Sequence, residues 1–138
     1  PLDLMKLVID TNVFISALIK DSKTRRLIKE IRANLLFPEY EFEELKEHKL
    51  EIIKKSLLTE REFNILFLKL LKYVNIIPDY IIEEYKEEAF NIMGRIDEKD
   101  VQFIATALAF NCSIWSDDKH FKKQDKVKIL TTNEMRIL

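Results

Sequence analysis

A short apolar run that ends on a carboxylate constrains this chain more than any other feature. Leu7, Val8 and Ile9 follow one another without a polar interruption, which is typical of a β-strand buried on both faces. Asp10 comes directly after this run. Because ligands of open α/β sheets bind beyond the carboxyl ends of the strands, a charged side chain at this position indicates a binding or catalytic site. The run therefore predicts an α/β protein with a site beside Asp10.

The size and composition fit one globular domain over residues 1–138. Hydrophobic residues make up 47% of the chain and charged residues 34%, which is enough for one core. No stretch approaches the roughly 20 apolar residues of a membrane helix, and the first residues do not resemble a signal peptide. We therefore expect a soluble, cytoplasmic protein without membrane contact. Since Met5 immediately precedes the first strand, we expect residues 1–4 to be a cloning remnant or a short extension.

The residues that usually bind soft metals are scarce. Cys112 is the only cysteine, which excludes an intramolecular disulfide and a cysteine-rich metal motif. His48 and His120 have no histidine partner at ligand spacing, so we interpret both as surface or packing residues. The net charge of −1 provides no global positive field, and any contact with a nucleic acid must therefore be local.

Short apolar runs alternate with segments of helical periodicity along the chain. We expect strands at residues 6–9, 35–37, 74–77, 112–115 and 127–130. We expect helices at residues 12–19, 24–34, 39–56, 59–71, 81–93 and 97–109, with a short one after residue 131. This order predicts a three-layer α/β/α sandwich with a mostly parallel central sheet of four to five strands. The apolar faces of the hairpin at 39–71 can cover the core or bind a second subunit, which makes a homodimer a hypothesis.

A second group of acids surrounds the fourth expected strand. Asp97 and Asp100 open the helix before it, and Asp117 and Asp118 follow it. Each of these residues also has an ordinary structural interpretation, as a helix cap, as a complement to the helix dipole or as a turn residue. Acids that follow two strands of one parallel sheet would, however, meet at the same edge. The combination of Asp10 with Asp118 therefore favours a common site.

Several carboxylates held within a few ångströms raise one another's pKa unless a cation neutralises them. Mg²⁺ and Mn²⁺ prefer such oxygen ligands, keep bound water and can bridge to a phosphate. A cluster of acids without a Cys or His motif thus suggests metal-assisted hydrolysis at phosphorus.

These motifs together resemble the PIN domain, the nuclease domain of VapC-type toxins. The resemblance rests on residues 9–12, a Glu-Leu pair on a helix after Pro38, the acids before residues 104–108, and residues 114–121. It extends over about residues 7–135 and implies an endoribonuclease that depends on Mg²⁺ or Mn²⁺. The implied partners are an RNA substrate and, for a toxin, an antitoxin protein. A stand-alone RNA-processing nuclease is the alternative within the family.

The resemblance implies a site of four acids, namely Asp10, Glu44, Asp100 and Asp118. Asp10, Asp100 and Asp118 would hold one or two divalent ions, while Glu44 would complete the cluster and help to orient water. The supporting residues that it implies are Asn12, Asp97 and Ser116.

Two of these assignments have an adjacent alternative. Glu43 competes with Glu44, because neighbouring helical residues point about 100° apart and only one can face the site. We prefer Glu44, which forms the Glu-Leu pair with Leu45. Asp117 competes with Asp118 in the same way, since it lies one position closer to the strand.

Other proteins that place an Asp after the first strand fit less well. A haloacid-dehalogenase-like phosphatase needs a second acid two residues later, where this chain has Asn12. A receiver domain needs an Asp at the end of the third strand, where this chain has Ile77 and Pro78. A PIN-like module that binds RNA without cleaving it is the non-enzymatic alternative. The presence of all four acids argues against it.

Overall fold

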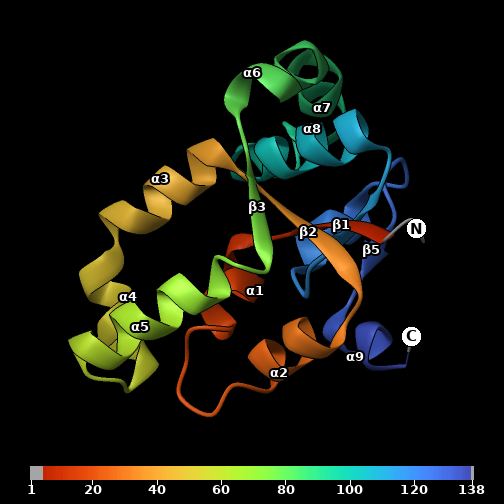
Figure 1. The fold of residues 1–138 in the computed structure, drawn as a ribbon. Coiled ribbons are helices and arrows are strands. Elements are labelled where there is room, and N and C mark those ends of the chain that lie inside the picture. The colour runs from red at the N-terminus through yellow and green to blue at the C-terminus, as the bar shows by residue number, and fades with distance from the viewer. Residues whose placement is uncertain (1–4, 138) are drawn as a thin grey trace.

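Five strands form the central sheet of the computed structural model, which describes residues 5–137 (Figure 1). They are β1 (Met5–Ile9), β2 (Ala33–Pro38), β3 (Val74–Ile77), β4 (Ser113–Trp115) and β5 (Ile129–Leu130). Their order is β3-β2-β1-β4-β5, and every neighbouring pair is parallel. This confirms the expected α/β class. The expectation for residues 1–4 falls outside the described residues.

The strand β1 lies at the centre of the sheet, between β2 and β4. Val8 pairs with Leu36 on one side and Ile114 on the other, and all three side chains are buried. Such an apolar strand requires helices on both faces of the sheet. The amide of Asp10 extends this pairing by donating to the carbonyl of Trp115 over 3.2 Å. The segments that follow β1 and β4 therefore leave the sheet side by side.

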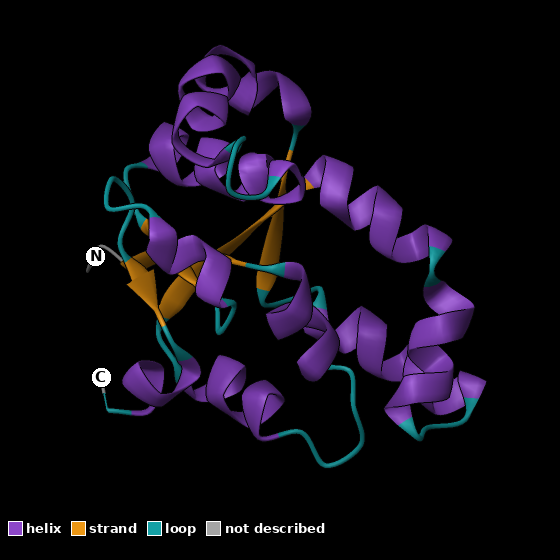
Figure 2. Ribbon diagram, turned by 180° about the vertical axis from the view of Figure 1, so that it is seen from behind, coloured by secondary structure: helices purple, strands orange, loops and turns teal. Residues whose placement is uncertain are grey.

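Helices cover both faces of the sheet (Figure 2). On one side lie α6 (Asp79–Ile82), α7 (Lys86–Met93) and α8 (Val101–Phe110) (Figure 1). On the other side lie α1 (Thr11–Ser16), α2 (Lys23–Glu30) and α9 (Thr132–Arg136). None of the helices in the described residues is both long enough and apolar enough to cross a membrane. The other helices are α3 (Glu39–Glu47), α4 (Lys49–Ser56) and α5 (Glu60–Leu70). The chain also forms the 3₁₀ turns η1 (Glu83–Tyr85), η2 (Glu98–Asp100) and η3 (Lys119–Lys123).

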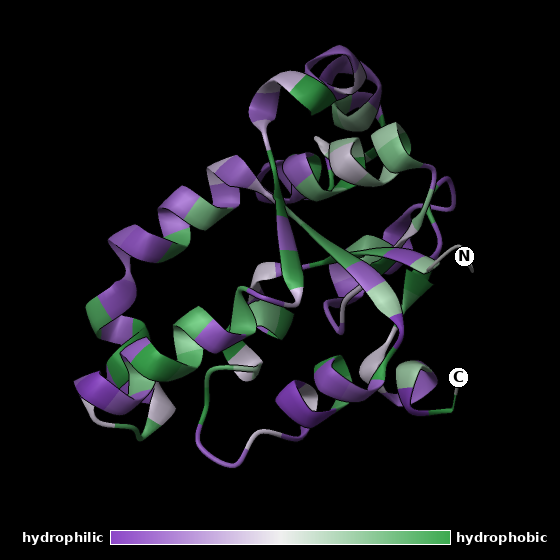
Figure 3. Cartoon of the chain, viewed as in Figure 1, coloured by the Kyte–Doolittle hydropathy of each residue, from purple (hydrophilic) through white to green (hydrophobic). Residues whose placement is uncertain are grey.

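The expected helix over residues 39–56 consists of two helices, α3 and α4. It is interrupted at His48, whose backbone angles of φ −102° and ψ 18° are not helical. No Pro or Gly stands near this position, so the break could not be predicted from the local sequence. The helices α3 to α5 form the expected hairpin, in which α3 is mostly hydrophilic and α5 mostly hydrophobic (Figure 3). Phe42 and Phe67 stack between α3 and α5 with ring centroids 5.9 Å apart.

The first helix ends at Ser16, three residues earlier than expected. Side chains that follow it bind the carbonyl groups at its end, and these groups need partners outside the helix. Ser22 donates to the Ser16 carbonyl over 2.6 Å. The guanidinium of Arg25 donates to the carbonyls of Ala17 and Ile19 over 2.7 and 2.9 Å. These bonds make an early helix end favourable and direct the chain into α2.

Candidate active site

Asp10 occupies the junction between β1 and α1. Its Oδ1 atom accepts a hydrogen bond from the amide of Val13 over 2.8 Å, so that Asp10 caps α1. Its Oδ2 atom accepts a hydrogen bond from the Ser116 hydroxyl. The residue is only 4% exposed. Burial raises the pKa of Asp10 to about 6, although both hydrogen bonds favour the charged form.

Ser116 connects the ends of the two central strands. It follows β4, and its amide donates to the carbonyl of Leu130 over 3.0 Å. Its hydroxyl donates to Asp10 and accepts a hydrogen bond from the amide of Asp118 over 2.9 Å. Ser116 therefore contacts both Asp10 and Asp118.

The adjacent residues Asp117 and Asp118 have different partners. Asp117 caps the start of α9, because its carboxylate accepts hydrogen bonds from the amide and the hydroxyl of Thr132 over 2.8 and 2.6 Å. Among the described residues, the carboxylate of Asp118 accepts one hydrogen bond, from the amide of His120 to Oδ1 over 2.9 Å, at the start of η3. The second oxygen of Asp118 thus stays available. This favours Asp118 over Asp117 as the site acid.

Asp100 is the last residue of η2 and the N-cap residue of α8, and it is nearly buried. It is 9% exposed, and its Oδ2 atom has no hydrogen-bond partner in the described part of the chain. Burial raises the pKa of Asp100 to about 7, and the charges of Asp97, Asp118 and Asp10 act in the same direction. A buried carboxylate without a donor is costly unless a cation lies beside it.

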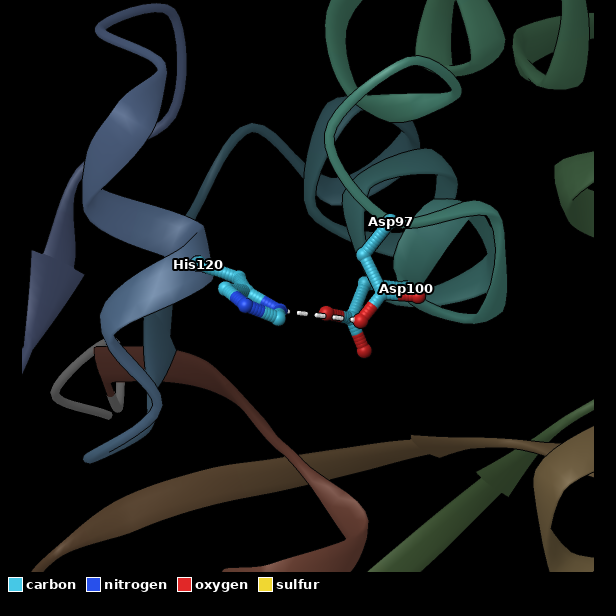
Figure 4. A group of neighbouring side chains, drawn as sticks. All are labelled: Asp97, Asp100 and His120. Atoms are coloured by element: carbon cyan, nitrogen blue, oxygen red, sulfur yellow. Dashed lines mark hydrogen bonds and ion pairs between the residues drawn. The ribbon is translucent and has the colours of Figure 1, made fainter.

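Asp97 completes this acidic group from the turn before α8. Its Oδ1 atom accepts from the amide of Lys99 over 3.0 Å, and its Oδ2 atom lies 3.0 Å from Nδ1 of His120. The hydrogen bond with His120 lowers the pKa of Asp97 below its usual value. Figure 4 shows the side chains of Asp97, Asp100 and His120 pointing toward one another. The sequence led us to expect only a surface or packing role for His120, so its place in the site was missed.

A pocket of about 560 Å³ opens beside these residues. Three residues expected near the site, Asn12, Asp117 and Asp118, lie in its wall. Lys119 contributes a positive charge to the same wall. The pocket is lined by Asn12, Val13, Ser16, Thr24, Asp117, Asp118, Lys119, His120 and Thr132.

Glu44 is placed differently from the other predicted acids. It is exposed on α3, and its charge raises the pKa of Glu41 and of Tyr40. Glu43 is also exposed and forms an ion pair with Lys46 at 3.0 Å. The acids whose charges raise the pKa of Asp10 or Asp100 come instead from the segments around residues 10, 97–100 and 117–118.

Glu41 is an acid on α3 that we did not expect in the site. It is half-buried, and burial together with the charge of Glu44 raises its pKa to about 7. It precedes Glu44 by three residues and so lies on the same side of the helix. The Glu-Leu motif drew attention to Glu44, whereas no pattern in the sequence distinguished Glu41.

The donor set fits a divalent cation. The charge of Asp118 raises the pKa of both Asp10 and Asp100, and one oxygen of Asp100 lacks a donor among the described residues. A hard cation such as Mg²⁺ or Mn²⁺ would remove both penalties. The group can therefore act as a metal centre at the carboxyl edge of the sheet.

Comparisons with known proteins place this arrangement in context. A family model described as PIN domain matches residues 8–138. The fold is similar to the crystal structure of VapBC2 from Rickettsia felis bound to a DNA fragment from their promoter, with a TM-score of 0.64. The alignment covers 92% of this chain and 98% of that chain at 16% identity, and it supports the fold alone. No match was found among curated proteins.

Proposed function

Because this chain belongs to the PIN-domain family, we propose that it is a metal-dependent endoribonuclease that hydrolyses RNA phosphodiester bonds. The observation that carries this proposal is the buried Oδ2 atom of Asp100, which has no hydrogen-bond partner among the described residues and lies among other acids. A purely structural aspartate in that position would be expected to accept hydrogen bonds, as Asp117 does from Thr132.

The acids and the pocket have separate tasks in this proposal. Asp10, Asp100 and Asp118 would hold one or two Mg²⁺ or Mn²⁺ ions, and Asp97 would support them from the rim. A bound ion would lower the pKa of a water molecule and offset the charge of the phosphate. The hydroxyl of Ser116 donates to Asp10 and accepts a hydrogen bond from the backbone amide of Asp118. Lys119, in the wall of the pocket, is placed to contact an RNA phosphate.

We further propose that the protein is the toxin of a toxin–antitoxin pair. This assignment rests on the resemblance of residues 9–12 and 114–121 to VapC-type toxins, and the fold that the chain shares with VapBC2 is consistent with it. An antitoxin protein would then be its partner. The homodimer and the cytoplasmic location expected from the sequence remain predictions.

The nuclease proposal can be tested by cleavage of a fluorescent single-stranded RNA with Mn²⁺, with Mg²⁺ and with EDTA. We expect the ions to support cleavage, EDTA to abolish it, and Asp100→Asn to reduce it by about 100-fold or more. Asp125→Asn is the matched control, because Asp125 is exposed and its charge is not among the causes that raise the pKa of Asp10 or Asp100. Circular dichroism should show that both variants are folded.

The opposite result would support the non-catalytic alternative. If the wild-type protein binds the RNA but leaves it intact with either ion, the chain is an RNA-binding module. Cleavage that survives Asp100→Asn would instead assign the activity to a contaminating nuclease.

A further inference from the structure

An imidazole faces the acids of the candidate active site (Figure 4). The Nδ1 atom of His120 lies 3.0 Å from Asp97 Oδ2 and 3.9 Å from Asp118 Oδ1. One ligand atom from each of Asp97, Asp100 and His120 can be chosen so that all three lie within 4.8 Å of one another. Opposite ligands of one ion are separated by about 4.4 Å, so small side-chain rotations bring all three atoms onto a single ion.

The backbone at His120 is held by the residues around it. Its amide donates to Asp118 Oδ1 over 2.9 Å, and the next residue, Phe121, is fully buried. The ring of Phe121 packs edge-on against Phe103 of α8, with centroids 6.2 Å apart. Because Asp100 stands at the start of α8, this contact sets the distance between His120 and Asp100. A ligand set held by buried packing is better organised than one on a free loop.

A second observation indicates that a cation belongs between these side chains. Asp100 is nine-tenths buried, and its Oδ2 atom has no hydrogen-bond partner in the described residues. Its carboxyl group points into the space shared with Asp97 and His120 (Figure 4). An ion that binds there would give the unpartnered oxygen a positive charge to contact.

The chemistry of the donors determines which ion fits. Mg²⁺ favours ligand sets made only of oxygen, whereas an imidazole nitrogen suits transition metals, and Mn²⁺ accepts both kinds of donor. We propose that His120 Nδ1 binds the divalent ion directly, beside Asp97 and Asp100, with the proton that Nδ1 shares with Asp97 in the metal-free protein displaced and the remaining ring proton on Nε2. This nitrogen makes the centre prefer Mn²⁺ to Mg²⁺. This inference rests on the proposed metal-dependent function and adds to it a ligand and an ion preference.

Pulsed EPR of Mn²⁺ bound to untagged protein tests the direct bond, because it detects a ¹⁴N nucleus coupled to the ion. The chain contains only two histidines, so His48→Ala and His120→Ala separate the two sources of an imidazole signal. His48 is exposed, and its Nδ1 atom lies 3.5 Å from Oε1 of Glu51. It is therefore a suitable control. We expect the ¹⁴N coupling in the wild type and in His48→Ala, and we expect it to be absent from His120→Ala.

Calorimetric titration measures the ion preference independently of any activity. His120→Ala should weaken Mn²⁺ binding by about tenfold or more and Mg²⁺ binding clearly less. His120→Asp supplies an oxygen in place of the nitrogen and should shift the ratio of affinities toward Mg²⁺. Thermal unfolding should show that each variant is folded before the titration is interpreted.

Two outcomes would overturn the inference. One is Mn²⁺ bound to the wild type without ¹⁴N coupling, and the other is equal loss of both ions in His120→Ala. In either case His120 would be a positioning residue that orients Asp97. RNA cleavage that persists in such a protein would leave the proposed nuclease intact, whereas ¹⁴N-coupled Mn²⁺ without cleavage would refute the nuclease and keep the ligand.

Discussion

The hydroxyl of Ser116 donates a hydrogen bond to Oδ2 of Asp10, a residue that precedes it by 106 positions. The bond joins the ends of β4 and β1, the two strands that meet at the centre of the sheet. It also explains why a buried carboxylate can keep a fixed orientation before any ligand binds.

Ser116→Ala removes the donor to Asp10 and the acceptor for the amide of Asp118. Without the hydroxyl, Asp10 loses a hydrogen bond that favours its charged form, so divalent ions should bind about tenfold more weakly at neutral pH. Isothermal titration with Mn²⁺ measures this loss. Ser116→Thr keeps a hydroxyl and should bind nearly as the wild type does. An equal loss in both variants would mean that shape rather than the hydrogen bond matters here.

The metal-free protein should become less stable as the pH rises from about 4 to 7, as far as Asp10 and Asp100 contribute. Burial raises their pKa values to about 6 and about 7, above the usual 3.8, so the folded state binds their protons more tightly than the unfolded state. Their contribution is therefore complete below pH 3.8 and is lost as the pH passes the folded values. The combined effect is on the order of a few kcal/mol.

The difference between two variants isolates this effect from the other carboxylates. Urea unfolding in EDTA should find Asp100→Asn more stable than the wild type at neutral pH, with a gap that closes on acidification. Asp125→Asn should show no such gap. Mn²⁺ should stabilise the wild type more at neutral pH than at about pH 5, since protonated acids bind metal poorly. A gap that does not change with pH would contradict the assigned cause.

Substitutions on α3 decide which of its acids serves the site. Our prediction from the resemblance is that Glu44→Gln reduces RNA cleavage by at least about tenfold. Glu43→Gln should have little effect, because Glu43 is exposed and paired with Lys46. The same assay should include Glu41→Gln, since Glu41 is the half-buried acid of this helix. A loss confined to Glu41→Gln would transfer the role of the fourth acid to Glu41.

Gly94→Ala should destabilise the turn that leads to Asp97. A Cβ atom at Gly94 would lie 2.6 Å from the carbonyl oxygen of Phe90 and 2.7 Å from its ring. The carbonyl oxygen belongs to the backbone of α7 and cannot move freely, so we expect a loss of about 1–3 kcal/mol in the free energy of unfolding. Chemical denaturation measures it. An unchanged midpoint would show that α7 relaxes without cost.

The sequence predicted the sheet and the position of Asp10 at the end of a strand, because an uninterrupted apolar run and the residue that follows it can be recognised from the local sequence. It predicted neither the break at His48 nor the separation of Asp117 from Asp118. The break occurs without Pro or Gly, and the two acids are distinguished only by Thr132, which lies 15 residues away. Residue spacing cannot show such a contact, because it depends on how α9 packs beside β4.

The role of His120 was hidden for a related reason. Single histidines have no spacing signal, and the partner of His120, Asp97, stands 23 residues earlier in the chain. Glu41 was hidden because several acids share its helix and only burial distinguishes it from the others. Both roles depend on tertiary structure, namely on the contact of His120 with Asp97 and on the burial of Glu41.

The central place of β1 also has a consequence during translation. A ribosome that adds about 5–20 residues per second completes β1 several seconds before β4. During this time, the edge of β1 that pairs with β4 in the folded protein is unpaired. The groups around Asp10 and Asp118 can meet only once β4 has been added next to β1. Whatever chemistry these groups perform, it can begin only after residues 113–118 have left the ribosome.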